Sequence, residues 1–109
     1  MMELNLSSDI IRGHINTIIL RLLMQEDMYG YRISKTIHSV TDGAFELKEA
    51  TMYSSLKRLE SDGCIIWYWG DETQGGRRKY YKITEKGKIT YIENKKNWEY
   101  AKSVLDKLL

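Results

Sequence analysis

The chain has 109 residues, which fits a single domain with a modest buried core. Its formal net charge of +2 does not by itself indicate a nucleic-acid partner, and its one cysteine excludes an intrachain disulfide. No apolar run approaches the ~20 residues that span a bilayer, and the N-terminus lacks the basic flank and apolar stretch of a signal peptide. We therefore expect a cytoplasmic protein without a membrane partner.

The first predicted helix begins at Ser7 or Ser8, either of which can cap it, and ends before the polar residues 25–27. Five apolar residues at helical spacing form its apolar face: Ile11, Ile15, Ile18, Ile19 and Leu22. Three more apolar residues lie outside that face: Ile10, Leu20 and Leu23. We expect part of this additional surface to face a second subunit.

Four apolar residues at helical spacing predict a second helix that ends before residues 41–43: Tyr29, Ile33, Ile37 and Val40. Two further apolar residues, Phe45 and Leu47, alternate with polar neighbours. This alternation predicts a very short strand between the second and third helices.

The third predicted helix, residues 50–62, has two different sides. Its apolar side consists of Met52, Leu56 and Leu59. Its polar side consists of Ser54, Lys57 and Ser61, with Tyr53 and Arg58 flanking it. Lys48 stands where a serine, aspartate or asparagine cap would be favoured, so the start of the helix stays open. Gly63 can take the left-handed conformation that ends a helix.

A two-stranded ribbon and a final helix complete the predicted order of elements. Residues 65–69 and 79–83 are rich in β-branched and aromatic residues, and Gly75-Gly76 supplies the positive φ that their connection needs. Thr84 can cap a helix that runs to the C-terminus. The predicted fold is α+β, mainly α: a winged helix-turn-helix over residues 1–83 and a dimerisation helix over residues 84–109.

The final helix carries a row of residues spaced as in a coiled-coil seam: Tyr91, Asn94, Trp98, Ala101, Leu105 and Leu108. We expect this row to form the interface of a homodimer, with help from the first helix. The earlier residues Ile89 and Ile92 point elsewhere, and we expect them to pack on the body of their own chain.

The positive charge is concentrated at the ribbon. Residues 77–88 hold six lysines and arginines against one glutamate, whereas residues 1–30 hold two arginines against four acidic residues. A helix in the major groove beside a basic ribbon suits double-stranded DNA. The predicted DNA contacts are Thr51, Tyr53, Ser54, Lys57, Arg58, Arg77, Arg78 and Lys79. The alternative is a winged-helix protein-interaction module that docks its basic ribbon on an acidic protein without binding DNA.

Nothing in the sequence indicates an enzyme, a metal site or a cofactor. His14 and His38 are isolated from each other and from Cys64, so no metal-ligand spacing occurs. No nucleophile elbow or phosphate loop is present. Trp67 and Trp69 are interpreted as packing residues of the ribbon.

Five segments in this order resemble the PadR family of transcriptional regulators: Tyr29-Gly30-Tyr31-Arg32-Ile33, Glu49-Ala50-Thr51-Met52-Tyr53, Leu56-Lys57-Arg58-Leu59-Glu60-Ser61-Asp62-Gly63, Gly75-Gly76-Arg77-Arg78-Lys79-Tyr80-Tyr81 and Ile83-Thr84-Glu85-Lys86-Gly87. The short C-terminus is similar to the compact subgroup of the family, which includes a lactococcal multidrug-responsive repressor. The resemblance implies a homodimeric repressor that binds an inverted-repeat operator and is released by a planar aromatic or multidrug-type small molecule.

The resemblance also implies a ligand site between the subunits, because Trp98 matches a tryptophan that stacks on flat aromatic drugs. The implied ligand-binding residues are Trp98, Asn16, Thr17 and Lys102. Lys102 stands where the multidrug-responsive relative has an acidic residue, so a preference for cationic drugs is not carried over. From the residues alone, packing in the dimer seam is the preferred explanation of Trp98, because aromatic residues at helical spacing usually pack.

Overall fold

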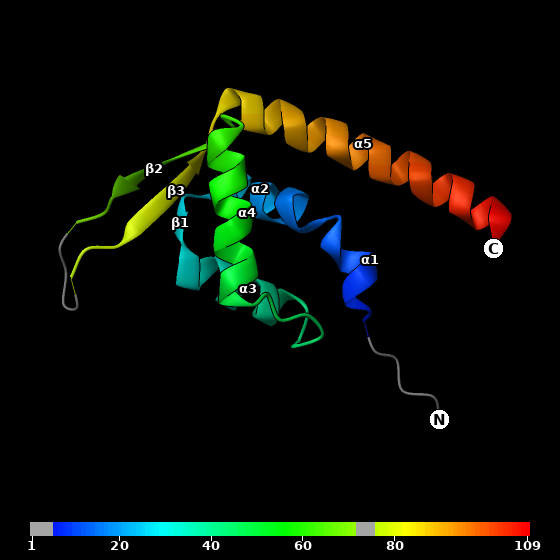
Figure 1. The fold of residues 1–109 in the computed structure, drawn as a ribbon, viewed down its shortest axis with the longest axis horizontal. Helices are drawn as coiled ribbons and strands as arrows, with labels where there is room; N and C mark the ends of the chain where they lie inside the picture. The colour runs from blue at the N-terminus through cyan, green and yellow to red at the C-terminus, as the bar shows by residue number, and fades with distance from the viewer. Residues whose placement is uncertain (1–5, 72–75) are drawn as a thin grey trace.

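The computed structural model of the chain describes residues 6–71 and 76–109. The elements follow one another as α1 Ser8–Arg12, α2 Ile15–Gln25, β1 Met28–Tyr29, α3 Gly30–Val40, α4 Glu49–Ser61, β2 Ile65–Trp69, β3 Lys79–Ile83 and α5 Glu85–Leu108. Figure 1 shows the hairpin of β2 and β3 projecting from one end of the helical body and α5 projecting from the other. The predicted mainly helical α+β fold is confirmed. Gly75 of the predicted ribbon turn lies outside the described residues, while Gly76 has a φ of 95°.

The first predicted helix is divided into α1 and α2 at Gly13 and His14. Ser7 caps α1 as predicted, since its side chain accepts a hydrogen bond from the Asp9 amide at 3.2 Å. Glycine is a poor helix former, and the His14 amide donates to the Ile11 carbonyl at 2.8 Å in a tighter turn. This turn redirects the chain, and α1 contributes no buried residue.

Leu20 and Leu23 lie in the core of their own chain, so the expectation that this surface faces a second subunit is wrong for both. Leu20 is 0% and Leu23 2% exposed. The reason is that α2 is surrounded: it packs against α4, α5 and β3. Ile10, on α1, remains 63% exposed.

The sheet contains a third strand, β1, that the sequence pattern did not predict, because Tyr29 was assigned to the second helix. Its order is β1-β3-β2, with all pairs antiparallel, and β1 joins through Met28 opposite Tyr81. The predicted strand at Phe45 and Leu47 is an irregular connection. The Phe45 amide donates to Thr41 Oγ1 at 3.2 Å, so this backbone group bonds locally instead of joining a ladder.

The junction between the hairpin and α5 is tightly fixed. Thr84 caps α5 as predicted: its Oγ1 accepts from the Gly87 amide at 3.1 Å and donates to the Gly63 carbonyl at 2.7 Å. A β-carbon on Gly87 would stand 2.1 Å from the Cys64 carbonyl oxygen. Gly63 ends α4 with a φ of 76°. These contacts bring the end of α4, the start of the hairpin and the start of α5 together.

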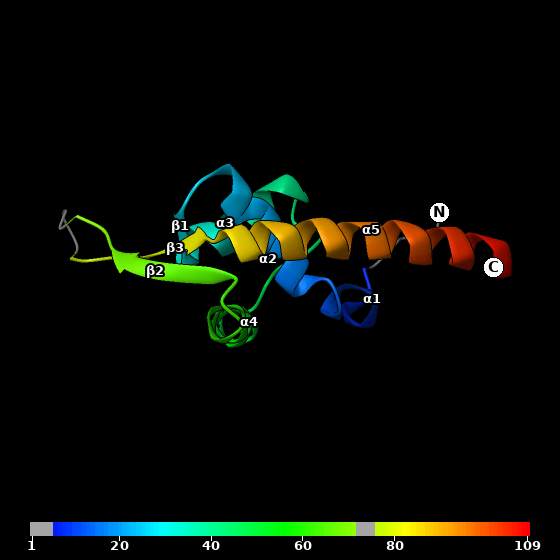
Figure 2. The ribbon, with the colours of Figure 1, turned by 90° about the horizontal axis from the view of Figure 1, so that it is seen from above.

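Ile89 and Ile92 are 57% and 48% exposed, so the prediction that they pack on the body of the chain is wrong. The side of α5 that faces α2 carries other residues, since Asn94 Nδ2 donates to Thr17 Oγ1 at 3.0 Å. Beyond Trp98, residues 99–109 are all exposed, and α5 extends past the body (Figures 1 and 2). Within residues 6–71 and 76–109, no helix combines the length and apolar character needed to cross a bilayer.

Candidate nucleic-acid interface

The α4 helix buries one side and presents the other. Met52, Leu56 and Leu59 are at most 2% exposed, which fixes the rotation of the helix about its axis. All five predicted DNA contacts on α4 are exposed: Thr51, Tyr53, Ser54, Lys57 and Arg58. Figure 2 shows α4 end-on at one side of the molecule. The exposed side of α4 is therefore free to enter a groove.

Tyr53 also has a structural role that the sequence did not reveal. Its side chain lies against Gly30 at the start of α3, where a β-carbon would stand 2.6 Å from Tyr53 Oη. The ring is 44% exposed, so Tyr53 belongs both to the outer face and to the contact between α3 and α4. Behind α4, burial raises the pKa of the Tyr81 phenol, with Tyr53 and Glu60 adding to the shift, so this group stays neutral.

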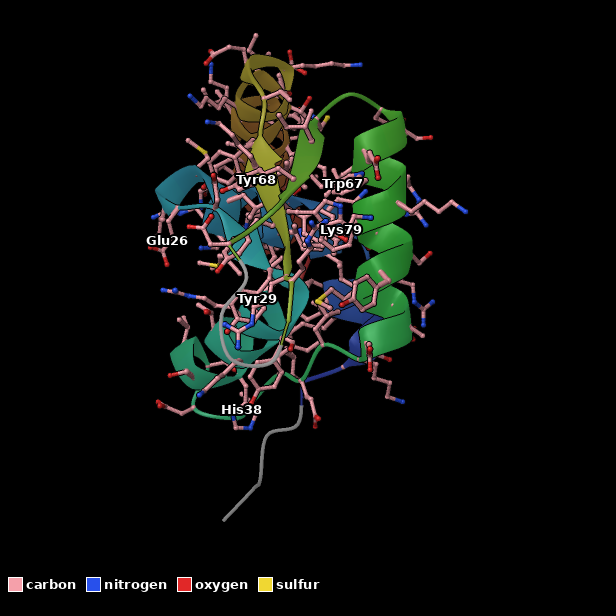
Figure 3. All side chains as sticks on the ribbon, turned by 90° about the vertical axis from the view of Figure 1, so that its left-hand side faces the viewer. Glu26, Tyr29, His38, Trp67, Tyr68 and Lys79 are labelled. Carbon is pink, nitrogen blue, oxygen red and sulfur yellow. The ribbon has the colours of Figure 1, made fainter. Side chains whose placement is uncertain are left out.

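The three predicted cations of the hairpin lie on different sides of it. Lys79 Nζ lies 4.2 Å from the centroid of the Trp67 ring, and Arg77 Cζ lies 6.0 Å from that of Trp69. Arg78 Cζ instead lies 4.5 Å from the centroid of Tyr29. Figure 3 shows Trp67 and Lys79 between the hairpin and α4, with Tyr29 on the other side. Lys79 therefore shares a surface with the exposed residues of α4, whereas Arg78 is held elsewhere.

Trp67 and Trp69 pack within the hairpin, as predicted. Neither is a core residue, since they are 37% and 52% exposed. Their rings pack edge to face with centroids 5.4 Å apart. Trp67 Nε1 also donates to Glu60 Oε1 on α4 at 3.0 Å. The alternation of the strand places both rings on the face of Lys79, but nothing in the sequence shows that α4 lies against that face.

The opposite face of the hairpin is fixed to the helical body. Tyr68 Oη donates to Asp27 Oδ2 at 2.5 Å, and its ring stacks on Tyr80 with centroids 5.8 Å apart. The hydrogen bond to Asp27 raises the pKa of Tyr68 from 10.0 to about 12. This contact joins β2 to the connection between α2 and β1, on the face of the hairpin turned away from α4.

An apolar groove of about 510 Å³ lies between α1, α2, the end of α3 and α5. Trp98 and Thr17, two of the four residues predicted to bind a ligand, line it together with Ile10, Val40 and Phe45. The Trp98 ring meets His14 edge to face, with centroids 4.7 Å apart. Two predicted ligand residues lie outside the lining. Lys102 is exposed on α5, and Asn16 is half-buried with an Oδ1 that accepts no hydrogen bond from the described residues.

The predicted seam residues of α5 fall into two groups. Tyr91 packs against the core, Asn94 bonds to Thr17 and Trp98 lines the groove. Ala101, Leu105 and Leu108 are exposed on the projecting end. In the described part of the chain, no group of three or more histidine, cysteine, aspartate or glutamate side chains is placed to hold a metal ion.

Sequence comparisons identify relatives over most of the chain. The model of the PadR-like family of transcriptional regulators matches residues 19–93. Protein X of Lysinibacillus sphaericus is 48% identical over 99 residues, which are 91% of this chain and 91% of that protein. Transcriptional regulator YqjI of Escherichia coli strain K12 is 29% identical over 87 residues, which are 80% of this chain but only 40% of that protein.

Solved structures of similar proteins share the arrangement of elements. A transcriptional regulator from Clostridium thermocellum superposes with a TM-score of 0.87 at 48% identity, covering 94% of this chain and 96% of that one. A PadR family transcription regulator from Clostridium difficile gives a TM-score of 0.76 at 40% identity, covering 88% and 98%. The residues that match the family model include α4, β2, β3 and the first part of α5.

Proposed function

The chain belongs to the PadR-like family of transcriptional regulators, and we propose that it binds double-stranded DNA as a homodimer through α4 and the β2–β3 hairpin. Members of this family are regulators rather than enzymes. The observation that carries the proposal is the shared surface of the two elements. The exposed side of α4 has Lys57 and Arg58, and Lys79 of the hairpin lies beside α4 (Figure 3).

The DNA contacts divide between the two elements. An α-helix fits the major groove, where Thr51, Ser54, Lys57 and Arg58 can meet base edges and phosphates. The hairpin then lies over the neighbouring backbone or minor groove, where Arg77, Arg78 and Lys79 are the available cations. We assign Lys79 the more direct contact, because it lies on the face of the hairpin beside α4, whereas Arg78 lies over the ring of Tyr29 on the other face.

The homodimer is supported by the form of α5. Residues 99–109 are exposed on a helix that leaves its own body, and Leu105 and Leu108 are 44% and 73% exposed. These side chains can be buried only against a partner. A second copy related by a twofold axis has the same exposed helix end and the same apolar groove against which they could pack. A symmetric dimer would present two α4 helices to an inverted-repeat operator, with half-sites ~34 to 36 Å apart.

A planar aromatic ligand is the regulator we propose for this dimer, acting at Trp98 in the groove beside α5. Aromatic stacking favours flat ligands, and the groove lies next to the helix that sets the subunit arrangement. A ligand there that alters the separation of the two α4 helices would release the operator and relieve repression. The coupling free energy between two binding sites of this kind is typically ~1 to 3 kcal/mol.

The salt dependence of binding to genomic DNA fragments tests the DNA proposal. The double substitution Lys57→Gln and Arg58→Gln should flatten the slope of log K against log salt by up to ~0.9 for each phosphate that the protein no longer neutralises. The control pair, Lys96→Gln and Lys107→Gln on α5, removes the same charge and should leave the slope unchanged. Equal slopes for the two variants would favour the protein-interaction module instead.

Displacement of the protein from selected DNA by planar aromatic compounds tests the ligand proposal separately. Wild-type protein should be released, whereas the Trp98→Leu variant should stay bound at the same compound concentration. Release of both to the same extent would show that Trp98 is not the site.

A further inference from the structure

Trp67 joins the hairpin to α4. Its indole Nε1–H donates to Glu60 Oε1 at 3.0 Å. Within residues 6–71 and 76–109, this is the only side-chain hydrogen bond between α4 and either β2 or β3. Both side chains are exposed, so the contact is not needed to fill the core. The contact instead links an exposed side chain of β2 directly to the exposed side of α4.

The same indole also holds a cation in place. Lys79 Nζ lies 4.2 Å from the centroid of Trp67 and 5.6 Å from that of Tyr81. Trp67 pairs with Tyr81 and Trp69 pairs with Lys79 across the hairpin, so Lys79 reaches diagonally over the Trp67 ring. The negative faces of both rings attract the ammonium group. Its charge is thereby kept between the hairpin and α4 (Figure 3).

We propose that Trp67 is a positioning residue for DNA binding, which sets the separation of α4 and the hairpin and directs Lys79 at the sugar-phosphate strand between them. The inference rests on the proposed DNA binding. When a helix occupies a major groove and a hairpin meets the adjacent backbone, a phosphate strand passes between them. A cation that is already ordered at that place loses little conformational entropy on binding.

The hydrogen bond is tested by measuring affinity for a mixed-sequence duplex of about 30 base pairs, roughly three helical turns. Trp67→Phe keeps the ring but removes the donor, and should weaken binding about three- to tenfold. Glu60→Gln keeps an acceptor, whereas Glu60→Met does not, and both remove the same charge. We therefore expect Glu60→Met to bind more weakly than Glu60→Gln by the same factor. Adding Trp67→Phe to Glu60→Met should have little further effect.

The placement of Lys79 is tested by the salt slope of the same binding. Trp67→Leu removes the ring beneath Lys79, and it should flatten the slope by up to ~0.9, as Lys79→Gln should. Trp67→Phe should leave the slope unchanged because a ring remains. If Trp67 had a purely structural role, the salt slopes of Trp67→Leu and Trp67→Phe would be the same.

Tyr68→Phe is the matched control. It also keeps an aromatic ring in β2 and removes one side-chain hydrogen bond to another element, but on the face turned away from α4. It should bind the duplex like the wild type. If Trp67→Phe binds like the wild type, or if Tyr68→Phe is weakened equally, the inference is overturned while DNA binding stands. Failure of the wild-type protein to bind any duplex would overturn the proposed function itself.

Discussion

The phenol of Tyr53 on α4 occupies the space that a β-carbon on Gly30 of α3 would need. Such a carbon would stand 2.6 Å from Tyr53 Oη and 3.0 Å from its Cζ. Gly30 is buried, whereas Tyr53 is partly exposed beside the proposed DNA contacts. The absence of a side chain at position 30 therefore lets α3 and α4 cross closely and sets the direction of the Tyr53 ring. This explains why a glycine follows Tyr29 although the position is helical.

Gly30→Ala is expected to destabilise the fold by about 1 kcal/mol, because overpacking exceeds the gain from replacing a helical glycine. In a Tyr53→Ala background only Met52 Cε would remain close, at 3.1 Å, and this flexible end of a side chain can shift. The same substitution should then be neutral or stabilising by about 0.5 to 1 kcal/mol. Chemical denaturation of the four proteins in this cycle measures the coupling. An equal cost in both backgrounds would show that Tyr53 does not fill the space at Gly30.

Gly87→Ala should be far more damaging, by roughly 3 kcal/mol, because the new β-carbon would meet a backbone atom. The Cys64 carbonyl oxygen would stand 2.1 Å away and cannot rotate aside as a side chain can. Gly13→Ala is the control, because nothing lies within 4 Å of its β-carbon position. It should stabilise the protein by about 0.4 to 1 kcal/mol. Thermal unfolding compares the two variants, and similar melting temperatures would contradict the packing described for α5.

Thr84→Ala should lower the free energy of unfolding by about 1 to 2 kcal/mol, since the hydroxyl both caps α5 and donates to Gly63. Thr84→Ser keeps the hydroxyl and should recover most of that stability. Urea denaturation measures the free energy of unfolding of the wild type and of both variants. Serine and alanine variants of equal stability would mean that the methyl group, rather than the cap, is what stabilises the junction.

Alkaline pH should remove the stabilising contribution of the Tyr68–Asp27 hydrogen bond. The pKa of Tyr68 is raised to about 12 from 10.0, so the folded protein holds this proton more tightly than the unfolded chain does. The contribution is thus complete below pH 10 and is lost as the pH rises through about 12. The difference in stability between wild type and Tyr68→Phe should shrink over that interval. A difference that stays constant would show that the phenol titrates normally.

The sequence predicted the elements that have strong local signals. The positions of Met52, Leu56 and Leu59 were sufficient to place α4 and its exposed side. The aromatic runs predicted both strands of the hairpin, and Thr84 predicted the start of α5. These signals are local, since helical and strand periodicities, a cap and a left-handed glycine depend on few neighbours.

The errors concern long-range packing. The strand β1 has only two residues, and what makes it a strand is Tyr81, far away in the sequence. Ile92 was assigned to the core because it is apolar, but the side of α5 that meets α2 is fixed by Asn94 and its bond to Thr17. Likewise, no local pattern shows that Lys79 lies beside α4. The face of the hairpin covered by α4 depends on how the whole domain packs.

The central claim is that two copies of α4 and its hairpin bind one operator together. Sedimentation equilibrium of the protein with a duplex selected from genomic fragments measures the number of chains per DNA molecule directly. Two chains per duplex, together with a dimer in the absence of DNA, are expected. One chain per duplex at saturation would contradict the account.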